Sequence, residues 1–521
     1  MQTVPSSFHQ KSQAGIRKHR WSLLMSFDKV FDNTITFFTL DSSNLDGTDV
    51  LAPVDNNPIQ YWDFYNYVSH TDRVVSLEWS RDVAFPFSVQ SSVASVVLNN
   101  FDNYYSSHTN SPINQYLLPG RPIKLLVSYE NETLLQQFVG LTQGKPELDQ
   151  SARTAKFESL DYLSEIFKLE LSESVAMSNV RTDEALAALF TQFGITSSQY
   201  RLARGRNVIP FLFLEQGKSG SEAFREIMQA EGGQLWIDEQ GLIRFDERLI
   251  PATGPVFTFS ESNISSIATS GETEIINRIK ITSNIREVQL PQPIHAGSGQ
   301  LSSPTLSDPV IIPASGTVTY NIKLDNPLAG YSQPTLGILT TDSWFTVTTS
   351  TGINIASNVS VTSSALTLNQ LSVTFTNTNG YDAYITAIEV YGQPAKIVDT
   401  INYEAFDQVS IDKYGEHLLD IKNDMFGSES NCESFAYTVL DAYSEFDSII
   451  ELSVKGNPAL QLGDIIWIDT TKIKGQFQMI KTSNSISPSG VSQIIKAKRY
   501  NPRYWFILDT SEFDGSDVLA P

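Results

Sequence analysis

Residues 458–468 read PALQLGDIIWI and are followed by GQF at 475–477. Gly463 and Asp464 form a turn signal, and the apolar, β-branched run directly after them is typical of a buried strand. Similar runs lie at 448–454, 477–483 and 491–500, each bounded by turn residues. The C-terminal part of the chain is therefore predicted to form a β unit.

A second β-rich stretch lies nearer the N-terminus. Its strand-like segments are 74–79, 88–100, 122–129 and 137–142, and the last two flank a turn as in a hairpin. After residue 156 the apolar spacing becomes helical. Helices are predicted over 157–171, 182–193, 221–233, 410–416 and 433–443, with a hairpin at 235–245. The chain is thus expected to hold two β units separated by helices.

A third region has a different composition. Residues 291–310 are rich in Pro, Gly and Ser, which marks a boundary, and 311–395 is a Thr- and Ser-rich series of short alternating strands. This pattern predicts a small β-sandwich inserted into a larger fold. The fold class is therefore α+β and β-rich, with several domains. The predicted parts are 1–58 (N-terminal arm and docking strand), 59–156 (first β-barrel), 157–234 (helical domain), 235–290 (β segment joining the barrels), 291–395 (inserted β-sandwich), 396–503 (second β-barrel with helices) and 504–521 (C-terminal docking strand).

Composition and charge narrow the functional classes. The chain has 521 residues, too many for one hydrophobic core. Its 36 basic and 58 acidic residues give a net charge of −22, which argues against a surface that grips nucleic acid in a sequence-specific way. The basic run at 17–20 is interpreted as part of a solvated, mobile arm over residues 1–35. The single cysteine, Cys432, excludes an intrachain disulfide and predicts folding in a reducing cytoplasm.

The two ends of the chain carry a repeated segment. Residues 40–53 and 508–521 are identical at ten of fourteen positions, and each follows an aromatic, strand-like run. A strand that ends in an Asp-Gly turn is typical of a docking strand, and the chain would use such a strand at both of its ends. The alternative is a calcium loop, whose weak metal-ligand candidates are Asp46, Asp49, Asp514 and Asp517. An EF-hand pattern with its closing Glu is absent from the sequence.

No sequence motif predicts catalysis or a cofactor. The six histidines lack metal-ligand spacing, and there is no nucleophile elbow or phosphate-binding loop. A catalytic pair of carboxylates that hydrolyses glycans is an alternative that the sequence leaves open, because acidic residues are abundant. Aromatic residues favour interfaces, and the interface candidates are Tyr61, Trp62, Phe64, Tyr65, Trp505 and Phe506. We expect a protein that is not an enzyme and that has no cofactor.

Several motifs occur in an order that resembles the tail tip or baseplate hub proteins of phages. LPGRPI at 118–123, FVG at 138–140 and FESLDYL at 157–163 resemble the first barrel of those proteins. Residues 223–245 resemble their linker region. The C-terminal stretch, with ELSV at 451–454 and then 458–468 and 475–477, resembles their second barrel. The resemblance covers most of 60–290 and 396–503, whereas 291–395 and both repeat copies depart from it.

This resemblance implies two tail-tube-like β-barrels per chain and a homotrimer whose six barrels match the tail tube. Such a hub would cap the tube at the virion tail tip after assembly in the host cytoplasm. Its partners would be a distal tail protein, the tail tube, the tape measure protein and a receptor-binding or fibre protein at the host cell surface. It would nucleate tail assembly and open for DNA passage. The alternatives are a glycan-binding adhesin that uses the 311–395 sandwich, and a tail-associated cell-wall hydrolase.

Overall fold

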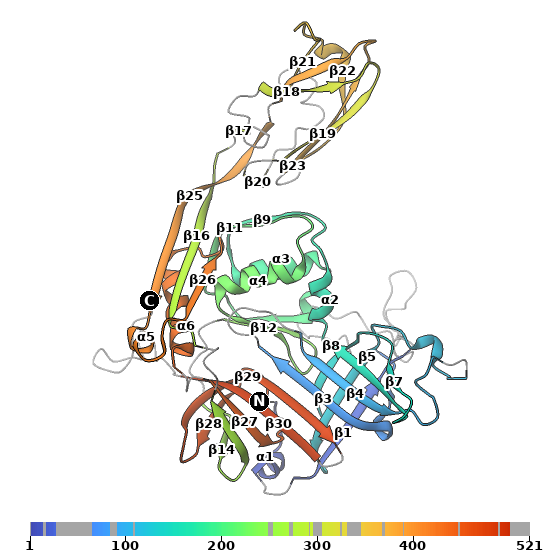
Figure 1. Cartoon of the computed structure of the whole chain (residues 1–521), viewed down its shortest axis with the longest axis vertical. Helices are drawn as coiled ribbons and strands as arrows, with labels where there is room; N and C mark the ends of the chain where they lie inside the picture. The colour runs from blue at the N-terminus through green and yellow to red at the C-terminus, as the bar shows by residue number, and fades with distance from the viewer. Residues whose placement is uncertain are drawn as a thin grey trace, which may run out of the picture.

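The fold has a wide β-rich base, a helical layer above it and a small β domain at the end of a long ribbon (Figure 1). None of the described helices is long and apolar enough to cross a membrane. The computed structural model describes residues 2–13, 17–27, 65–83, 91–107, 110–247, 254–269, 275–290, 292–294, 305–323, 326–330, 345–366, 370–388, 390–445, 449–487 and 490–500.

Over the residues that the structure describes, the base is a single hydrogen-bonded sheet of fourteen strands that contains two six-strand units. Unit 1 consists of β1 (His19–Met25), β3 (Val74–Asp82), β4 (Val93–Asn99), β5 (Pro122–Tyr129), β6 (Leu135–Thr142) and β8 (Thr154–Leu160). Two short strands, β2 (Val68–Ser69) and β7 (Glu147–Asp149), lie at its borders. Unit 2 consists of β14 (Phe257–Ser260), β15 (Ile264–Thr269), β27 (Ile449–Lys455), β28 (Ile465–Asp469), β29 (Lys474–Ser487) and β30 (Gly490–Arg499).

The two units have the same strand order. When the six strands of each unit are numbered along the chain, both units run 2-3-6-5-4-1 across the sheet: β3-β4-β8-β6-β5-β1 in unit 1 and β15-β27-β30-β29-β28-β14 in unit 2. Equivalent pairs of neighbouring strands are antiparallel in both units, with one exception. The first strand lies antiparallel to the fourth in unit 1 and parallel to it in unit 2.

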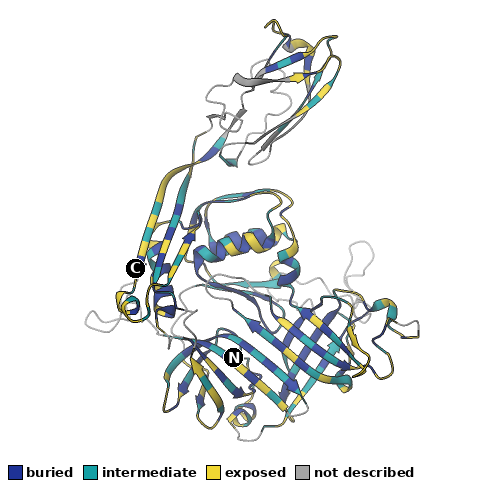
Figure 2. Ribbon diagram, in the orientation of Figure 1, coloured by how far each residue is buried: buried dark blue, intermediate teal, exposed yellow. Residues whose placement is uncertain are grey.

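Each unit has its own apolar core, and buried residues alternate with more exposed ones along its strands (Figure 2). In β4, for example, Ala94, Val96 and Leu98 are buried while the residues between them are more exposed. A short link also connects the two ends of each unit, directly between the outermost strands in unit 2 and through β2, which pairs with β1, in unit 1. Residues 70–73 connect β2 to β3, and residues 261–263 connect β14 to β15. The core of unit 1 includes Leu23, Leu77, Leu125, Phe138 and Phe157, and that of unit 2 includes Phe259, Leu452, Ile466, Phe477 and Ile495.

A mixed helical layer occupies the chain between the units. It contains α2 (Leu163–Lys168), β9 (Val175–Arg181), α3 (Thr182–Gln192), β10 (Tyr200–Leu202), β11 (Val208–Leu214), α4 (Gly220–Glu231), β12 (Gln234–Ile237) and β13 (Ile243–Asp246). Helix α4 corresponds to the helix predicted over 221–233, but it begins one residue earlier and ends two residues earlier. Ser219 accepts a hydrogen bond from the backbone of Glu222 at its start, and Gly232 adopts φ 71° at its end. The predicted 235–245 hairpin is the β12–β13 pair.

A long ribbon carries the inserted domain away from the base. Strands β16 (Arg278–Val288) and β25 (Val390–Phe406) pair antiparallel over most of the length of β16. The predicted sandwich region holds two three-stranded sheets, one of β18 (Thr305–Ile312), β24 (Ala383–Ile388) and β21 (Phe345–Thr348), the other of β19 (Thr317–Lys323), β23 (Gln370–Asn377) and β22 (Val359–Leu366). Strands β17 (Gln292–Ile294) and β20 (Leu328–Gly330) border the ribbon. Near its base lie α5 (Gln408–Tyr414), β26 (Leu418–Lys422) and α6 (Glu429–Tyr443).

Two local predictions are wrong. The N-terminal segment is not a mobile arm over its described part: α1 (Ser6–Gln13) packs on the base, and β1 pairs with β5 along its whole length. Helix 157–171 is also wrong in its first half, because Phe157 and Leu160 belong to strand β8 and the helix begins only at Leu163. The spacing of Leu160, Leu163 and Phe167 matches a helix by coincidence across a strand-to-helix junction.

Candidate functional site

The same turn begins the central hairpin of each unit. Gly120 and Gly463 adopt positive φ angles of 72° and 83°, a conformation that glycine takes without steric cost. The amide of Gly120 donates to the carbonyl oxygen of Thr142 (2.6 Å), and that of Gly463 donates to Met479 (2.9 Å). In both units the receiving residue donates its own amide back to the residue after the glycine. The two turns are therefore equivalent positions of a repeated structure.

A β-bulge also occurs at the same place in both units. In unit 1 the register between β3 and β4 shifts between Val74 and Ser76. In unit 2 the register between β15 and β27 shifts between Ile264 and Ser266. Each bulge inserts one extra residue directly after the start of the second strand, which increases the local twist. The repetition therefore extends from strand order to the register between the second and third strands.

The FVG motif allows two strands of unit 1 to approach closely. A Cβ atom on Gly140 would overlap the carbonyl oxygen of Leu160, at the point where β6 meets β8. Only glycine fits there without moving the backbone.

We expect Gly140→Ala to lower the free energy of unfolding by about 1–3 kcal/mol, because the added methyl must displace backbone in a packed core. Gly144→Ala is the matched control, since its Cβ would meet no atom within 4 Å. Urea unfolding followed by tryptophan fluorescence measures both changes. Equal stability of the two variants would contradict the steric explanation.

Asp161, in the FESLDYL motif at 157–163, links the start of helix α2 to the entrance of strand β4. Asp161 is buried and accepts hydrogen bonds from the amides of Ser92 (2.6 Å), at the entrance to β4, and Leu163 (3.1 Å), at the start of α2. Burial raises the pKa of the Asp161 carboxyl to about 6, although the hydrogen bonds from Ser92 and Leu163 oppose that rise.

The two units meet at a seam formed by β3 and β29. Residues 77–82 of β3 pair antiparallel with 486–481 of β29, so the sheet runs without a break from one unit into the other. Across the seam the hydroxyl of Ser483 donates to Ser80 (3.3 Å), and Lys481 pairs with Asp82 (2.9 Å). The small side chains leave a shallow hollow of about 350 Å³ on the outer face, lined by Glu78, Trp79, Ser80, Val93, Ser95, Ser483, Asn484, Ser485, Ser492 and Ile494.

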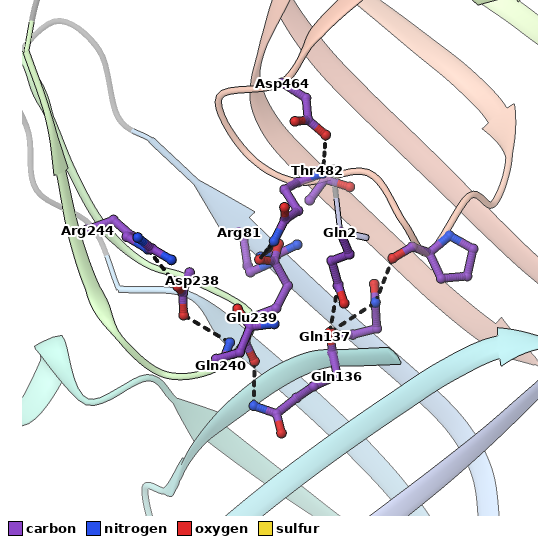
Figure 3. Close-up of polar contacts among 12 residues, drawn as sticks. Gln2, Arg81, Gln136, Gln137, Asp238, Glu239, Gln240, Arg244, Asp464 and Thr482 are labelled. Carbon is purple, nitrogen blue, oxygen red and sulfur yellow. Dashed lines mark hydrogen bonds and ion pairs between the residues drawn. The ribbon is translucent and has the colours of Figure 1, made fainter. Parts of the chain in front are cut away.

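A buried polar cluster connects the seam to the helical layer (Figure 3). Arg81 of β3 forms an ion pair with Glu239, and both side chains are at most 2% exposed. Glu239 lies in the turn of the β12–β13 hairpin. Gln461 of unit 2 donates to its carboxylate (2.5 Å), and Gln136 of unit 1 donates to its backbone oxygen (2.6 Å). One hairpin turn therefore contacts both units at once.

The N-terminal segment extends the same contact between the units (Figure 3). Phe8 is buried against Tyr129 of β5 and Ala459 of unit 2. The amide of Gln2 donates to the oxygen of Ala459 (2.8 Å), and the side chain of Gln2 donates to the oxygen of Gln136 (3.0 Å). Arg17 donates to the carbonyl oxygen of Lys455 (2.5 Å). These contacts explain why the segment is ordered despite its polar sequence.

Most of the predicted site residues lie outside the described part of the chain: Tyr61, Trp62, Phe64, Trp505, Phe506, Asp46, Asp49, Asp514 and Asp517. Their roles stay predictions. Tyr65 is described, and it packs on Val139 and Leu141 of β6. Among the described residues, no group of three or more His, Cys, Asp or Glu side chains could hold a metal ion.

Sequence reasoning missed the Arg81–Glu239 pair, although one signal was present. In β3 the inward positions are Leu77, Trp79 and Arg81. A charged residue on the apolar face of an alternating strand requires a buried partner of opposite charge. The sequence does not show which acid supplies it, because Glu239 is 158 residues away.

The architecture is thus a β-rich α+β fold in which one six-strand unit occurs twice, with a helical layer and an inserted β domain. No protein-family model and no curated protein sequence matches the chain. Solved structures do match, and they include tail proteins, a phage P2 baseplate and a type VI secretion component.

Three of these structures illustrate the similarity. The chain is similar to a tail protein from Neisseria meningitidis MC58, with 8% identity over 83% of this chain and 94% of that one and a TM-score of 0.46. It is similar to a 43 kDa tail protein of prophage MuSo2 from Shewanella oneidensis, with 10% identity, 83% and 96% coverage and a TM-score of 0.44. It is also similar to the Escherichia coli c3393 protein, a type VI secretion component, with 8% identity, 82% and 74% coverage and a TM-score of 0.36.

Proposed function

We propose that the chain is a structural subunit of a phage tail tip, a hub that caps the tail tube, and that three copies close a collar of six β-barrel units. The observation that carries the proposal is the repeated unit, with one strand order, one turn and one bulge in two places. A chain with two equivalent units can present six nearly equivalent positions as a trimer, which matches a six-fold tube.

The barrel interpretation is supported by the connections of each sheet. In unit 2 residues 261–263 join the outermost strands β14 and β15 directly, and in unit 1 residues 70–73 join the outermost strand β3 to β2, which pairs with the other outermost strand, β1. A six-strand sheet whose ends are held that close must curl around its core. The separate apolar clusters of the two units agree with this interpretation.

The remaining parts suit a connector. The inserted sandwich lies at the far end of the β16–β25 ribbon and suits contact with a receptor-binding protein or the host surface (Figure 1). The net charge of −22 suits a collar through which DNA passes without being held. We further propose that such a hub contacts the tape measure protein, nucleates the tube and acts without covalent chemistry.

The repeated segments at 40–53 and 508–521 are proposed as docking strands for neighbouring tail proteins. Ten identities in fourteen positions imply that both copies are recognised by the same kind of surface. A synthetic peptide of residues 505–521 should then compete for binding of the full chain to assembled tail tube. Competition should fail when Asp514 and Val518 are both replaced by Ala, because these residues supply a charge and an apolar contact that the two copies share.

We expect native mass spectrometry of the purified chain to give particles of three copies of the 57.9 kDa subunit. The physical reason is that the sheet ends in open strands, which need partners. A concentration series separates a weak trimer from a monomer. Single copies at all concentrations, including after addition of tail tube protein, would contradict the collar.

A further inference from the structure

The seam inside one chain is a template for the contact between chains. In the seam, the second strand of unit 1 (β3) pairs with the C-terminal half of the fifth strand of unit 2 (β29). If six equivalent units form a ring, the second strand of unit 2 must meet the fifth-strand region of unit 1 in the next copy. The residues of that second contact can be assigned, because the two units correspond in register.

The correspondence of the second strands follows from their shared bulge. Beyond the bulge, Trp79 of β3 lies opposite Ala94, and Thr269 of β15 lies opposite Ile450. The third strands align at these same positions, because Ala94 lies three residues before Val97 and Ile450 lies three residues before Ser453, the nearer flanking residue of each bulge. Thr269 is therefore the unit 2 equivalent of Trp79.

The correspondence of the fifth strands follows from the sixth strands. Ala155 of β8 and Gln493 of β30 lie opposite equivalent residues of the third strands. On their other side, Ala155 lies opposite Leu148 of β7, and Gln493 lies opposite Asn484 of β29. Strand β7 is thus the unit 1 equivalent of the half of β29 that forms the seam.

Both equivalent strands have an open edge within the described part of the chain. Strand β15 ends the path of the large sheet and pairs with β27 alone, and four of its six residues are exposed. Strand β7 pairs with β8 alone, and all three of its residues are exposed, with Leu148 at 40%. Open strand edges template pairing with another chain, so an unpaired edge needs a partner or a block.

We propose that β15 of one copy pairs antiparallel with β7 of the next copy, with Leu148 opposite Thr269 and Asp149 opposite Ala268. The inference rests on the proposed ring and names the residues that close it. The pairing repeats the intrachain seam, in which Asn484 lies opposite Trp79. It makes a head-to-tail contact that closes after three copies.

Disulfide trapping in the full chain tests this register. Opposed residues of antiparallel strands have Cα atoms about 4.5–5.5 Å apart, which lies in the range for a disulfide. The native Cys432 is fully buried and does not compete. The double variant Asp149→Cys/Ala268→Cys should give covalent dimers and trimers on a non-reducing gel after oxidation, which disappear on reduction.

The intrachain seam supplies a matched positive control. Ser485 and Glu78 occupy the equivalent positions there and lie opposite each other. Ser485→Cys/Glu78→Cys should therefore form a disulfide within one chain, with no gain in mass. For the negative control, Ala268→Cys is combined with Asp420→Cys, an exposed residue on β26, and should give at least tenfold less covalent trimer.

The outcomes separate this inference from the proposed function. Trimers by native mass spectrometry without the Asp149–Ala268 cross-link, while the intrachain control forms, would overturn the β15–β7 contact and leave the collar standing. Native mass spectra that show only single copies would overturn both the collar and the β15–β7 contact. Equal cross-linking by the Asp420 pair would show that random collisions cause the bond, and would also overturn the assigned register.

Discussion

Glu239→Ala should be among the most destabilising single substitutions in the chain, with a loss of about 3–5 kcal/mol in the free energy of unfolding. The substitution leaves the Arg81 guanidinium buried without its partner carboxylate. It also removes the acceptor of the Gln461 side chain, and so weakens the contact between the hairpin turn and unit 2. Urea unfolding with tryptophan fluorescence measures the loss, because Trp79 and Trp236 lie in neighbouring elements.

Two further variants make this test specific. Arg81→Met/Glu239→Leu removes both charges and should recover most of the lost stability, since two buried apolar side chains need no partner. Glu158→Ala breaks the exposed Lys156–Glu158 pair and should cost less than about 1 kcal/mol. A double variant as unstable as Glu239→Ala would show that packing or the Gln461 contact, and not the unpaired charge, causes the loss.

A second large effect is expected from pH, through His70 in the link that joins β2 to β3. The ring is 4% exposed, its Nδ1 lies 2.6 Å from the hydroxyl of Tyr105, and the ring of Phe27 meets it edge-on. Burial, and then the charge of Arg73, lower the pKa of His70 from 6.5 to about 4. Arg73 is itself held by Asp102 at 2.8 Å.

The direction of the effect follows from proton binding. Between pH 6.5 and about 4 the unfolded chain binds a proton at His70 and the folded chain does not, so acidification destabilises the fold by about 3 kcal/mol over this range. Asp161 acts in the opposite direction. Its raised pKa makes the folded chain bind a proton first as pH falls from about 6 to 3.8, which stabilises the fold.

Single variants separate the two groups. We expect His70→Gln to become more stable relative to the wild type as pH falls from 7 to 4, and Asp161→Asn to become less stable relative to the wild type over the same range. Urea midpoints at several pH values measure both differences. A constant difference between His70→Gln and the wild type across this range would show that His70 does not hold its proton differently in the folded chain.

Local features of the fold could be predicted from the sequence. The turn at Gly463 and the helix from Ser219 to Gly232 depend on residues close together in the chain, so their signals are local. The inserted β region was also predicted, because its Thr- and Ser-rich composition differs from that of its surroundings. Helix α1 was missed because SSFHQKSQ buries only Phe8 and Ser12, which gives no apolar period.

The candidate site could not be predicted, because its contacts are between distant segments. The β3–β29 seam pairs strands from opposite ends of the chain, and no local pattern states which edge a strand will meet. The sequence also gives no sign of which residues of the two repeated units are equivalent. Their equivalent residues, such as Trp79 and Thr269, share a place in the sheet but not a side-chain type.

The length of chain enclosed by the seam has a consequence for biosynthesis. Ser80 and Ser483 are 403 residues apart, so β3 leaves the ribosome long before β29 exists. During translation the edge of β3 stays unpaired, and such an edge favours misassembly with other nascent chains. Contacts of such high sequence separation also fold slowly. The yield of native protein should therefore depend on chaperones that cover this edge until the last strands emerge.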